Sequence, residues 1–314
     1  MAEQAEILVV TPILPAQMAQ LEALYRLHRY DQAADKAGLL ADVAGRVRAV
    51  VTTGGKGFGA ELLAQLPRLE IVASSGVGTD TIDVAACVAR GVPVTNTPDV
   101  LNDDVADLGI GLILSALRHL PQGHDYVRSG DWARQGMMGF TTTVTGKTLG
   151  IVGLGRIGHE LADRAKALKM RIAYTGRHKQ DVAYDYYADL GELARQADVL
   201  ALTCPGGAAT RGLIGAPQLV ALGPDGWLVN LSRGSVVDED ALIAALTART
   251  IRGAALDVYA SEPKVNPTLT ALSNVVFYPH HASGSQETRS AMSQLVVDNL
   301  AAHFAGRPLL TPLQ

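Results

Sequence analysis

Short runs of β-branched and other apolar residues alternate with helix-length segments along the whole of this chain. Ten of these runs have the length of a strand, and most are continuously apolar, without an alternating polar face. The ten are Ile7–Val10, Ala49–Thr52, Ile71–Ser74, Val92–Thr95, Thr148–Val152, Arg171–Tyr174, Val199–Leu202, Trp227–Asn230, Ala254–Val258 and Val275–Tyr278. Continuous apolar strands are typical of a parallel sheet that is buried on both faces by crossover helices. The pattern therefore predicts one or two doubly wound α/β domains.

Length and composition narrow the class of protein. The chain has 314 residues, which is long enough for two domains. Its hydrophobic content of 48% is too high for an intrinsically disordered protein. Its two cysteines, Cys87 and Cys204, have no zinc-ligand spacing and predict neither a metal site nor a disulfide framework. A net charge of −4 gives no general reason to bind nucleic acid or an anionic membrane. The N-terminus is acidic and no apolar run approaches about 18 residues, so we expect a cytoplasmic protein.

Two long helices are predicted from apolar residues at helical spacing. The first covers residues 102–120, and the second covers residues 286–304, where Gly306 and Pro308 end it. Both are long for crossover helices, so both could join domains rather than only cover one sheet.

The most informative motif is Gly153-Leu154-Gly155-Arg156-Ile157-Gly158, which follows the strand candidate Thr148–Val152 directly. It has the G-x-G-x-x-G order, and apolar spacing predicts a helix from Arg156 to Leu168. In such a turn the glycines permit a tight bend, a close approach to pyrophosphate, and close packing of helix on sheet. The helix N-terminus then favours phosphate groups. A glycine turn without a ligand is the alternative, but the strand before it and the helix after it favour a bound dinucleotide.

The end of the next strand indicates which dinucleotide is bound. NAD sites usually place Asp or Glu there to accept a hydrogen bond from the ribose 2′-OH. Here the sequence reads Thr175-Gly176-Arg177-His178-Lys179, and the first carboxylate is Asp181. A 2′-phosphate would be repelled by an acid and could be held by two donors of Arg177. A solvated basic turn is the alternative, but the missing acid and the arginine together favour NADP(H), with NAD(H) possible.

Three polar residues follow later strands. Arg233 comes after Trp227–Asn230, Glu262 after Ala254–Val258, and His280 after Val275–Tyr278. In open parallel sheets, ligands bind at the carboxyl ends of the strands. An arginine can hold the carboxylate of a 2-keto acid, a histidine can move a proton, and a carboxylate can orient the histidine. Each residue taken singly also has an ordinary structural explanation, so spacing leaves the set as a hypothesis.

Six motifs occur in a fixed order: Ser75–Asp80, Val94–Leu101, Gly153–Gly158, Ser232–Gly234, Asp257–Pro263 and Pro279-His280. In this order they closely resemble the D-isomer-specific 2-hydroxyacid dehydrogenases, especially the NADPH-preferring glyoxylate/hydroxypyruvate and hydroxyphenylpyruvate reductases. The resemblance covers nearly the whole chain. It implies a Rossmann cofactor domain at residues 101–284, inserted into a flavodoxin-like substrate-binding domain made of residues 1–100 and 285–314. It also implies a homodimer formed through the cofactor domain.

The resemblance also implies roles for individual residues. Arg233 would bind a small 2-keto acid such as glyoxylate or hydroxypyruvate, His280 would be the acid/base, and Glu262 would be its partner. The backbone amides of Val77 and Gly78 would hold the substrate carboxylate. The implied contacts to the cofactor are Gly153, Leu154, Gly155, Arg156, Ile157, Gly158, Thr175, Gly176, Arg177, Cys204, Pro205 and Asp257, the last at the nicotinamide carboxamide.

Several alternatives remain at this stage. A nucleotide-sensing binding protein on the same fold, like the corepressors that resemble these dehydrogenases, would carry the same residues, although the complete polar set favours an enzyme. A formate dehydrogenase is disfavoured, because that branch lacks the glutamate that Glu262 provides here. The loop Thr52–Phe58 is expected to border the side-chain end of the substrate pocket. The segment Trp132–Phe140 either reaches a partner subunit or packs internally, and His281 stands where the family usually has a small or apolar residue.

Overall fold

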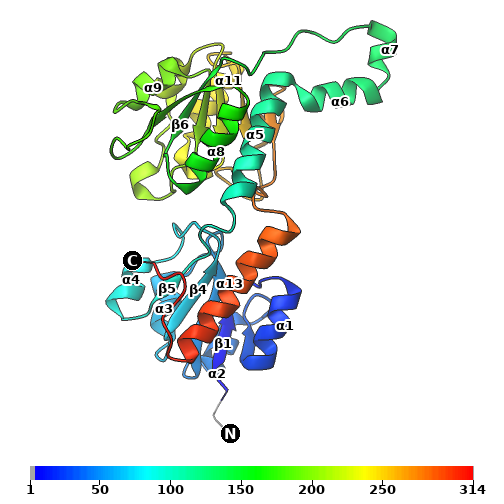
Figure 1. The fold of residues 1–314 in the computed structure, drawn as a ribbon. Coiled ribbons are helices and arrows are strands. Elements are labelled where there is room, and N and C mark those ends of the chain that lie inside the picture. The colour runs from blue at the N-terminus through cyan, green and yellow to red at the C-terminus, as the bar shows by residue number, and fades with distance from the viewer. Residues whose placement is uncertain (1–3, 314) are drawn as a thin grey trace. The chain divides into compact units, whose positions relative to one another are not determined.

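A computed structural model describes residues 4–313, which form two compact units (Figure 1). Unit 1 contains the chain up to Leu101 and again from Gly284 onward, and unit 2 contains Asn102–Ser283. Unit 1 is therefore built from two separate stretches of sequence. None of the helices in the described range is long and apolar enough to cross a membrane. The same residues contain no cluster of three or more His, Cys, Asp or Glu side chains that could hold a metal ion.

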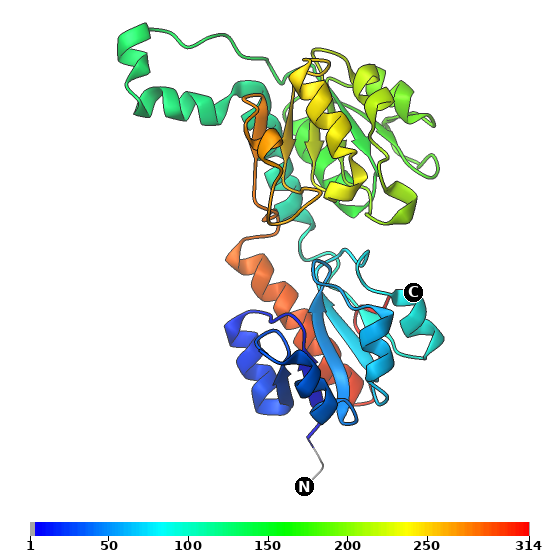
Figure 2. The ribbon, with the colours of Figure 1, turned by 180° about the vertical axis from the view of Figure 1, so that it is seen from behind.

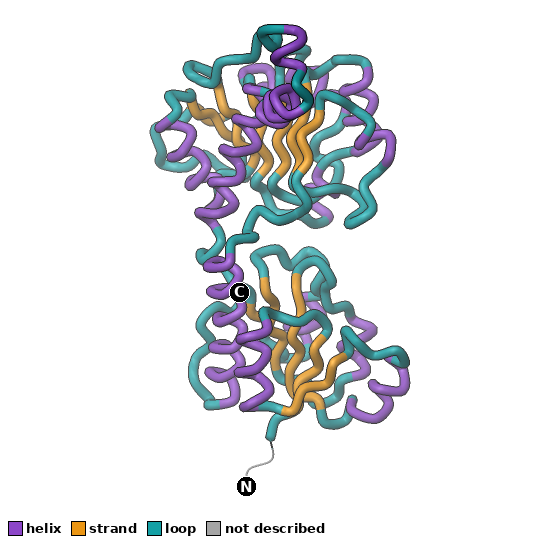
Figure 3. The backbone as a smooth tube through the Cα atoms, turned by 90° about the vertical axis from the view of Figure 1, so that its right-hand side faces the viewer, coloured by secondary structure: helices purple, strands orange, loops and turns teal. Residues whose placement is uncertain are grey.

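Unit 1 is a five-stranded parallel sheet with helices on both faces (Figure 3). Its strands are β1 (Glu6–Val9), β2 (Arg26–Arg29), β3 (Val47–Thr53), β4 (Ile71–Ser75) and β5 (Val94–Thr95), in the order β2-β1-β3-β4-β5. Its helices are α1 (Pro15–Leu24), α2 (Lys36–Val43), α3 (Ala60–Gln65), α4 (Val84–Ala89) and α13 (Gln286–Phe304). This is the strand order of flavodoxin-like sheets, in which the winding direction reverses between β1 and β3.

Strand β1 shows why its apolar run is continuous. Ile7 and Val9 pack in the core that includes Leu300 of α13, whereas Leu8 packs in a second core with Leu40 of α2. All three strand residues are fully buried. A sheet with one solvated face would have placed a polar residue at every second position.

Unit 2 is a seven-stranded parallel sheet with helices on both faces (Figure 2). Its strands are β6 (Thr148–Val152), β7 (Arg171–Thr175), β8 (Asp185–Tyr186), β9 (Val199–Leu202), β10 (Trp227–Asn230), β11 (Gly253–Leu256) and β12 (Val275–Phe277). Its helices are α5 (Asn102–Arg118), α6 (Leu120–Arg128), α7 (Asp131–Gln135), α8 (Arg156–Ala167), α9 (Leu190–Gln196), α10 (Ala216–Leu222), α11 (Glu239–Thr247) and α12 (Pro267–Thr270). The strand order β12-β11-β10-β9-β6-β7-β8 reverses direction between β6 and β9, as in dinucleotide-binding Rossmann sheets.

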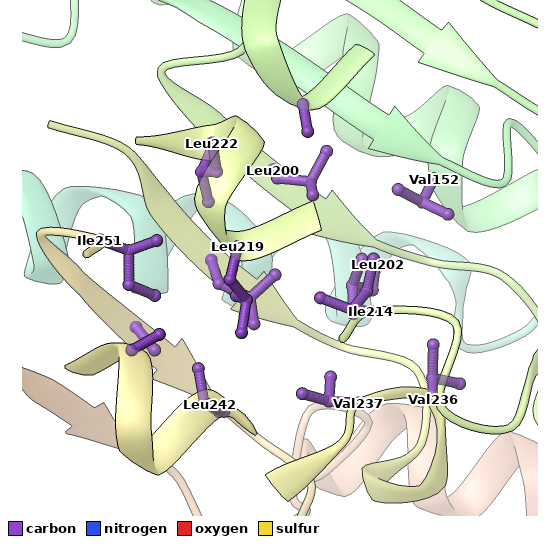
Figure 4. Close-up of a cluster of buried hydrophobic side chains, with 14 of the residues drawn as sticks. Val152, Leu200, Leu202, Ile214, Leu219, Leu222, Val236, Val237, Leu242 and Ile251 are labelled. Carbon is purple, nitrogen blue, oxygen red and sulfur yellow. The ribbon is translucent and has the colours of Figure 1, made fainter. Parts of the chain in front are cut away.

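A large apolar core of unit 2 lies between the sheet and helices α9, α10 and α11 (Figure 4). Its labelled members are aliphatic and buried: Val152, Leu200, Leu202, Ile214, Leu219, Leu222, Val236, Val237, Leu242 and Ile251. Two of them, Val152 and Leu202, are the last residues of β6 and β9. The core therefore fixes the strand ends from which the loops of the candidate site begin.

The prediction of two doubly wound parallel sheets is confirmed. All ten predicted strands are present, and their ends lie within two residues of the expected positions. Two further strands, β2 and β8, were not predicted, and both are edge strands of their sheets. It was wrong to extend the first long helix to Leu120, because His119 has a left-handed φ of 52° and ends the helix at Arg118.

Helices α6 and α7 belong to an arm, residues 119–142, that projects from the rest of unit 2 (Figures 1 and 2). Neither helix contains a buried residue. The arm exposes large apolar side chains, with Trp132 at 62%, Met137 at 82% and Phe140 at 96% exposure. The alternative that Trp132–Phe140 packs internally is therefore wrong for a single copy of the chain.

Candidate active site

The glycine motif forms the turn between β6 and α8. Gly153 has a φ of 96°, and a Cβ atom there would lie 2.7 Å from the Cα of Cys204. A Cβ atom on Gly158 would lie 2.6 Å from the carbonyl oxygen of Gly153. Gly155 differs, since a Cβ atom there would meet no atom within 4 Å. Two of the glycines are therefore required by close contacts within the protein, and the third borders open space.

This turn fits the pyrophosphate of a dinucleotide. An α-helix leaves the N–H groups of its first turn without intrahelical partners, and the N-cap of α8 is Gly155, which has no side chain to accept from them. Open space in front of such a helix N-terminus favours a phosphate group. Leu154 is buried behind the turn, and Arg156 and Ile157 begin the helix. The six residues of the motif thus form one cradle.

The turn after β7 lies beside the glycine motif. The carbonyl oxygen of Thr175 accepts a hydrogen bond from the N–H of Gly153 at 3.0 Å. Thr175 is buried, whereas Gly176 and Arg177 are exposed. Arg177 has no ion pair within the described part of the chain, so its guanidinium is available to a phosphate group.

Gln180 holds this turn in place through hydrogen bonds, a role that was not predicted from the sequence. Its side-chain nitrogen donates to the carbonyl oxygen of Leu154 at 2.7 Å, and its side-chain oxygen lies 3.0 Å from Nε2 of His159 on α8. Its backbone N–H donates to the hydroxyl of Tyr174 at 2.7 Å. One neutral side chain therefore connects the exposed basic turn to both the glycine motif and the helix behind it.

The segment after β9 connects the glycine motif to the turn that carries Arg233. Cys204 packs against Gly153, and its carbonyl oxygen accepts a hydrogen bond from the hydroxyl of Ser232. Burial raises the pKa of the Cys204 thiol, which stays protonated at neutral pH and shapes the turn rather than reacting. The next residue, Pro205, is exposed and lies just beyond the carboxyl end of β9.

Asn230, the last residue of β10, holds the backbone of Arg233 in place. Its side-chain oxygen accepts a hydrogen bond from the N–H of Ser232, and its side-chain nitrogen donates to the carbonyl oxygen of Arg233, both at 3.0 Å. Asn230 is 1% exposed. Sequence reasoning missed this positioning role, although a polar residue that ends an apolar strand was a usable signal.

Glu262 and His280 form a hydrogen-bonded pair in the loops that follow β11 and β12. Oε2 of Glu262 lies 2.5 Å from Nδ1 of His280, and Oε1 accepts a hydrogen bond from the N–H of Tyr259 at 2.9 Å. The side chains of His280 and Glu262 are 39% and 32% exposed, so a ligand can reach them. Burial raises the pKa of Glu262, but the two hydrogen bonds and the charges of His280 and Arg233 outweigh burial and lower it overall. Glu262 is therefore ionised at neutral pH.

Asp257 shapes the turn that carries His280. Its carboxylate accepts hydrogen bonds from the N–H groups of His281 at 2.8 Å and Ala282 at 3.2 Å. Its carbonyl oxygen accepts from the N–H of His280 at 2.7 Å, which supports the left-handed φ of 49° at that residue. Burial raises the pKa of Asp257, although the backbone hydrogen bonds oppose this shift. Each carboxylate oxygen keeps a second lone pair, and the residue is 1% exposed.

The turn after β10 touches the loop of Glu262 through Gly234. A Cβ atom on Gly234 would lie 1.9 Å from the carbonyl carbon of Tyr259, so only glycine permits this approach. The hydroxyl of Tyr259 donates to the carbonyl oxygen of Tyr278 at 2.7 Å, two residues before His280. The structure thus brings Arg233, Glu262 and His280 to one edge of the sheet of unit 2.

Val77 and Gly78 lie in unit 1, in the loop after β4. The carbonyl oxygen of Val77 accepts a hydrogen bond from the side chain of Asn96 at 3.0 Å, which fixes the loop. Among residues 4–313, the N–H groups of Val77 and Gly78 have no acceptor. Two successive free N–H groups are suited to bind a carboxylate.

Comparisons with known proteins agree with this arrangement. Residues 110–282 match the family profile described as D-isomer specific 2-hydroxyacid dehydrogenase, NAD binding domain. The chain is 47% identical over 312 residues to glyoxylate/hydroxypyruvate reductase A of Arabidopsis thaliana, and 45% identical over 312 residues to hydroxyphenylpyruvate reductase of Plectranthus scutellarioides. Each alignment covers 99% of both proteins. Among solved structures, the NADPH-dependent glyoxylate/hydroxypyruvate reductase of Sinorhizobium meliloti, in complex with NADP and malonate, superposes with a TM-score of 0.94 at 42% identity, covering 99% of this chain and 97% of that one.

Proposed function

Since this chain belongs to the D-isomer-specific 2-hydroxyacid dehydrogenase family, we propose that it is an NADPH-preferring reductase of small 2-keto acids. Glyoxylate, hydroxypyruvate and their relatives are the proposed substrates, and D-2-hydroxy acids the products. The observation that carries the proposal is the Glu262–His280 pair, at 2.5 Å, beside Arg233. We assign cofactor binding to residues 101–284 and substrate binding to residues 1–100 and 285–314.

The proposed mechanism gives each side chain a separate task. The bound dinucleotide would supply a hydride to the keto carbon of the substrate. Arg233 holds the carboxylate and keto oxygens and stabilises the negative charge that develops on the keto oxygen. Protonated His280 donates the proton that completes the alcohol, and ionised Glu262 stabilises the imidazolium before the transfer. The N–H groups of Val77 and Gly78 hold the substrate carboxylate.

A direct assay tests this proposal. Purified protein is mixed with NADPH and with glyoxylate, hydroxypyruvate or 4-hydroxyphenylpyruvate, and the loss of NADPH absorbance is followed. We expect turnover of at least one of these acids. The products from hydroxypyruvate and 4-hydroxyphenylpyruvate should have the D configuration, whereas the glycolate formed from glyoxylate is achiral. If NADPH binds but none of the three is reduced, the result favours the nucleotide-sensing alternative.

The double substitution Thr175→Asp with Arg177→Ala should move the cofactor preference toward NADH. The new carboxylate accepts from the ribose 2′-OH, and the 2′-phosphate loses a bidentate charged partner. We expect the NADPH/NADH ratio of kcat/KM to fall about 100-fold, the size expected for hydrogen bonds to charged groups. Arg171→Ala, at the opposite end of β7, is the control and should leave the ratio unchanged. An unchanged ratio in the double variant would refute the assignment of Arg177.

Glu262→Gln should move the acid requirement for reduction to lower pH. Because the pKa of Glu262 is lowered, the carboxylate is negative across the neutral range and stabilises the protonated imidazole of His280. Neutral glutamine removes that stabilisation, so the rate of reduction should begin to decline at a lower pH than in the unaltered protein. The measurement is kcat/KM for glyoxylate between pH 5 and 9. The matched control is Glu239→Gln. The carboxylate of Glu239 accepts a hydrogen bond from the N–H of Ala260, in the loop that carries Glu262, and its replacement should leave the pH profile unchanged.

We also propose that the arm of residues 119–142 forms a homodimer. Exposed Trp132 and Phe140 would be covered by a second copy of unit 2. Trp132→Glu with Phe140→Glu should therefore halve the molecular mass measured by light scattering after size-exclusion chromatography. Val220→Glu is the control, since Val220 is 64% exposed on α10 and outside the arm. A dimer that survives the double substitution would exclude the arm as the interface.

A further inference from the structure

Unit 1 contains a cavity of about 460 Å³ at the carboxyl ends of β1 and β3. The winding of this sheet reverses between these two strands, and such switch points are where open parallel sheets bind ligands. Because a water molecule occupies about 30 Å³ in the liquid, the cavity has room for a larger ligand than a two-carbon acid. The reaction proposed for glyoxylate leaves this space unexplained.

The charged side chains that line the cavity favour an anion. Lys36 and Lys56 both line it, are exposed, and form no ion pair within the described part of the chain. The ammonium of Lys36 lies 4.8 Å from the ring centre of Tyr30, which orients it without neutralising it. Asp31 also lines the cavity, but Arg29 holds both of its carboxylate oxygens, at 2.9 and 2.6 Å. The uncompensated charge at the cavity is therefore positive.

The loop that carries Lys56 also touches the loop of Val77 and Gly78. A Cβ atom on Gly54 would lie 2.1 Å from the carbonyl oxygen of Gly78, so the two loops are in direct contact. The hydroxyl of Thr81, another cavity residue, donates to the carbonyl oxygen of Gly54 at 2.5 Å. The free N–H groups of Val77 and Gly78 and the lysine-lined cavity are therefore neighbouring parts of unit 1.

From this arrangement we propose that the cavity is a subsite for the far end of the substrate, and that Lys36 and Lys56 select 2-keto acids with a second anionic group there. The inference rests on the proposed function, in which Val77 and Gly78 hold the carboxylate next to the keto group. The substrate class is then an elongated 2-keto dicarboxylate or a phosphorylated 2-keto acid. Carboxylate and phosphate share the chemistry that two ammonium groups recognise.

The test compares pairs of acids in which only one member has an anionic far end. Oxaloacetate, 2-oxoglutarate and 2-oxoadipate are paired with the acids of equal carbon number that end in a methyl group, 2-oxobutanoate, 2-oxopentanoate and 2-oxohexanoate. 3-Phosphohydroxypyruvate is paired with hydroxypyruvate, which lacks the phosphoryl group. For at least one pair we expect the wild type to have the higher kcat/KM with the anionic member. Lys56→Met or Lys36→Met should lower that preference about fivefold, the range of an exposed ion pair, and the double variant should lower it further.

Two controls make the result decisive. Lys56→Arg keeps the charge and should keep the preference, and Lys166→Met removes an exposed lysine of unit 2 and should not change it. The proposal is overturned if the wild type shows no preference in any pair, or if the lysine variants change both members of a pair equally. Failure of the proposed function looks different, because the wild type would then reduce neither glyoxylate nor any other acid of the set.

Discussion

With His280 replaced by glutamine, we expect kcat for the reduction of glyoxylate to fall about a thousandfold and the Kd of NADPH to change little. Glutamine has a polar side chain but cannot serve as an acid near neutral pH, and a positioned general acid contributes about 10²–10⁴-fold to a rate. In the structure, Nδ1 of His280 bonds Glu262 at 2.5 Å, which leaves Nε2 for the substrate oxygen. Single-turnover measurement by stopped flow separates this loss from slow product release.

The adjacent histidine provides the matched control. His281 is also exposed, and the structure uses its backbone N–H, which bonds Asp257 at 2.8 Å, rather than its ring. His281→Gln keeps that backbone contact, so we expect a kcat close to that of the unaltered protein. If the two substitutions reduced kcat equally, the acid would not be His280 alone.

Replacing Arg233 by methionine should lower kcat/KM for keto acids by about 10³-fold or more. The substitution removes the proposed two-pronged contact to the substrate and the charge proposed to stabilise the developing oxyanion, and loss of one such donor alone costs about 10²–10³-fold. Arg233→Lys restores the charge without the planar fork, so it should recover only part of the loss. Steady-state kinetics with glyoxylate gives both numbers.

Loss of activity in Arg233→Met could also result from a destabilised fold, and the contacts of Arg233 make this explanation testable. Its backbone is held by Asn230, whose hydrogen bonds do not involve the guanidinium. The guanidinium donates from Nη1 to the carbonyl oxygen of Ser232 at 2.8 Å. Because a hydrogen bond of this kind contributes about 1 kcal/mol, Arg233→Met should lower the thermal midpoint by only a few degrees and keep the NADPH affinity of the unaltered protein. A large fall in the midpoint would show that the guanidinium supports the fold, and the assignment to substrate binding would then lose its basis.

Strands in a sheet that is covered on both faces could be predicted from sequence, because every residue of such a strand is buried and the run is therefore continuously apolar. The run Thr148–Val152 and the glycines after it predicted a strand and a tight turn, and the structure has both. β2 escaped prediction since it reads Arg26-Leu27-His28-Arg29 and lies at the edge of its sheet, where side chains remain partly solvated. The two-residue β8 is too short to show any periodicity.

The strand-end positions of the candidate site residues were predictable, but most of their supports were not. Tyr259 and Gln180 act through hydrogen bonds to backbone groups 19 and 26 residues away, and no spacing rule reveals such partners. Asn230 differs, because it bonds residues only two and three positions further along the chain. The contact of Gly234 with Tyr259 likewise depends on how two loops meet. Composition also could not show that the apolar arm projects away from the sheet, because exposed and buried tryptophans look alike in sequence.

The split construction of unit 1 has a consequence for synthesis. One face of its N-terminal sheet is covered by α1 and α13 together, and Val296 and Leu300 of α13 complete the core around Ile7 and Ile71. At roughly 5–20 residues per second, a ribosome needs about 10–40 s to pass from the end of β5 to the end of α13. Unit 2 is continuous and can close its core in that interval, while the first sheet has an apolar face that α1 covers only in part. The nascent chain is therefore most prone to aggregate, and most in need of a chaperone, just before its final helix emerges.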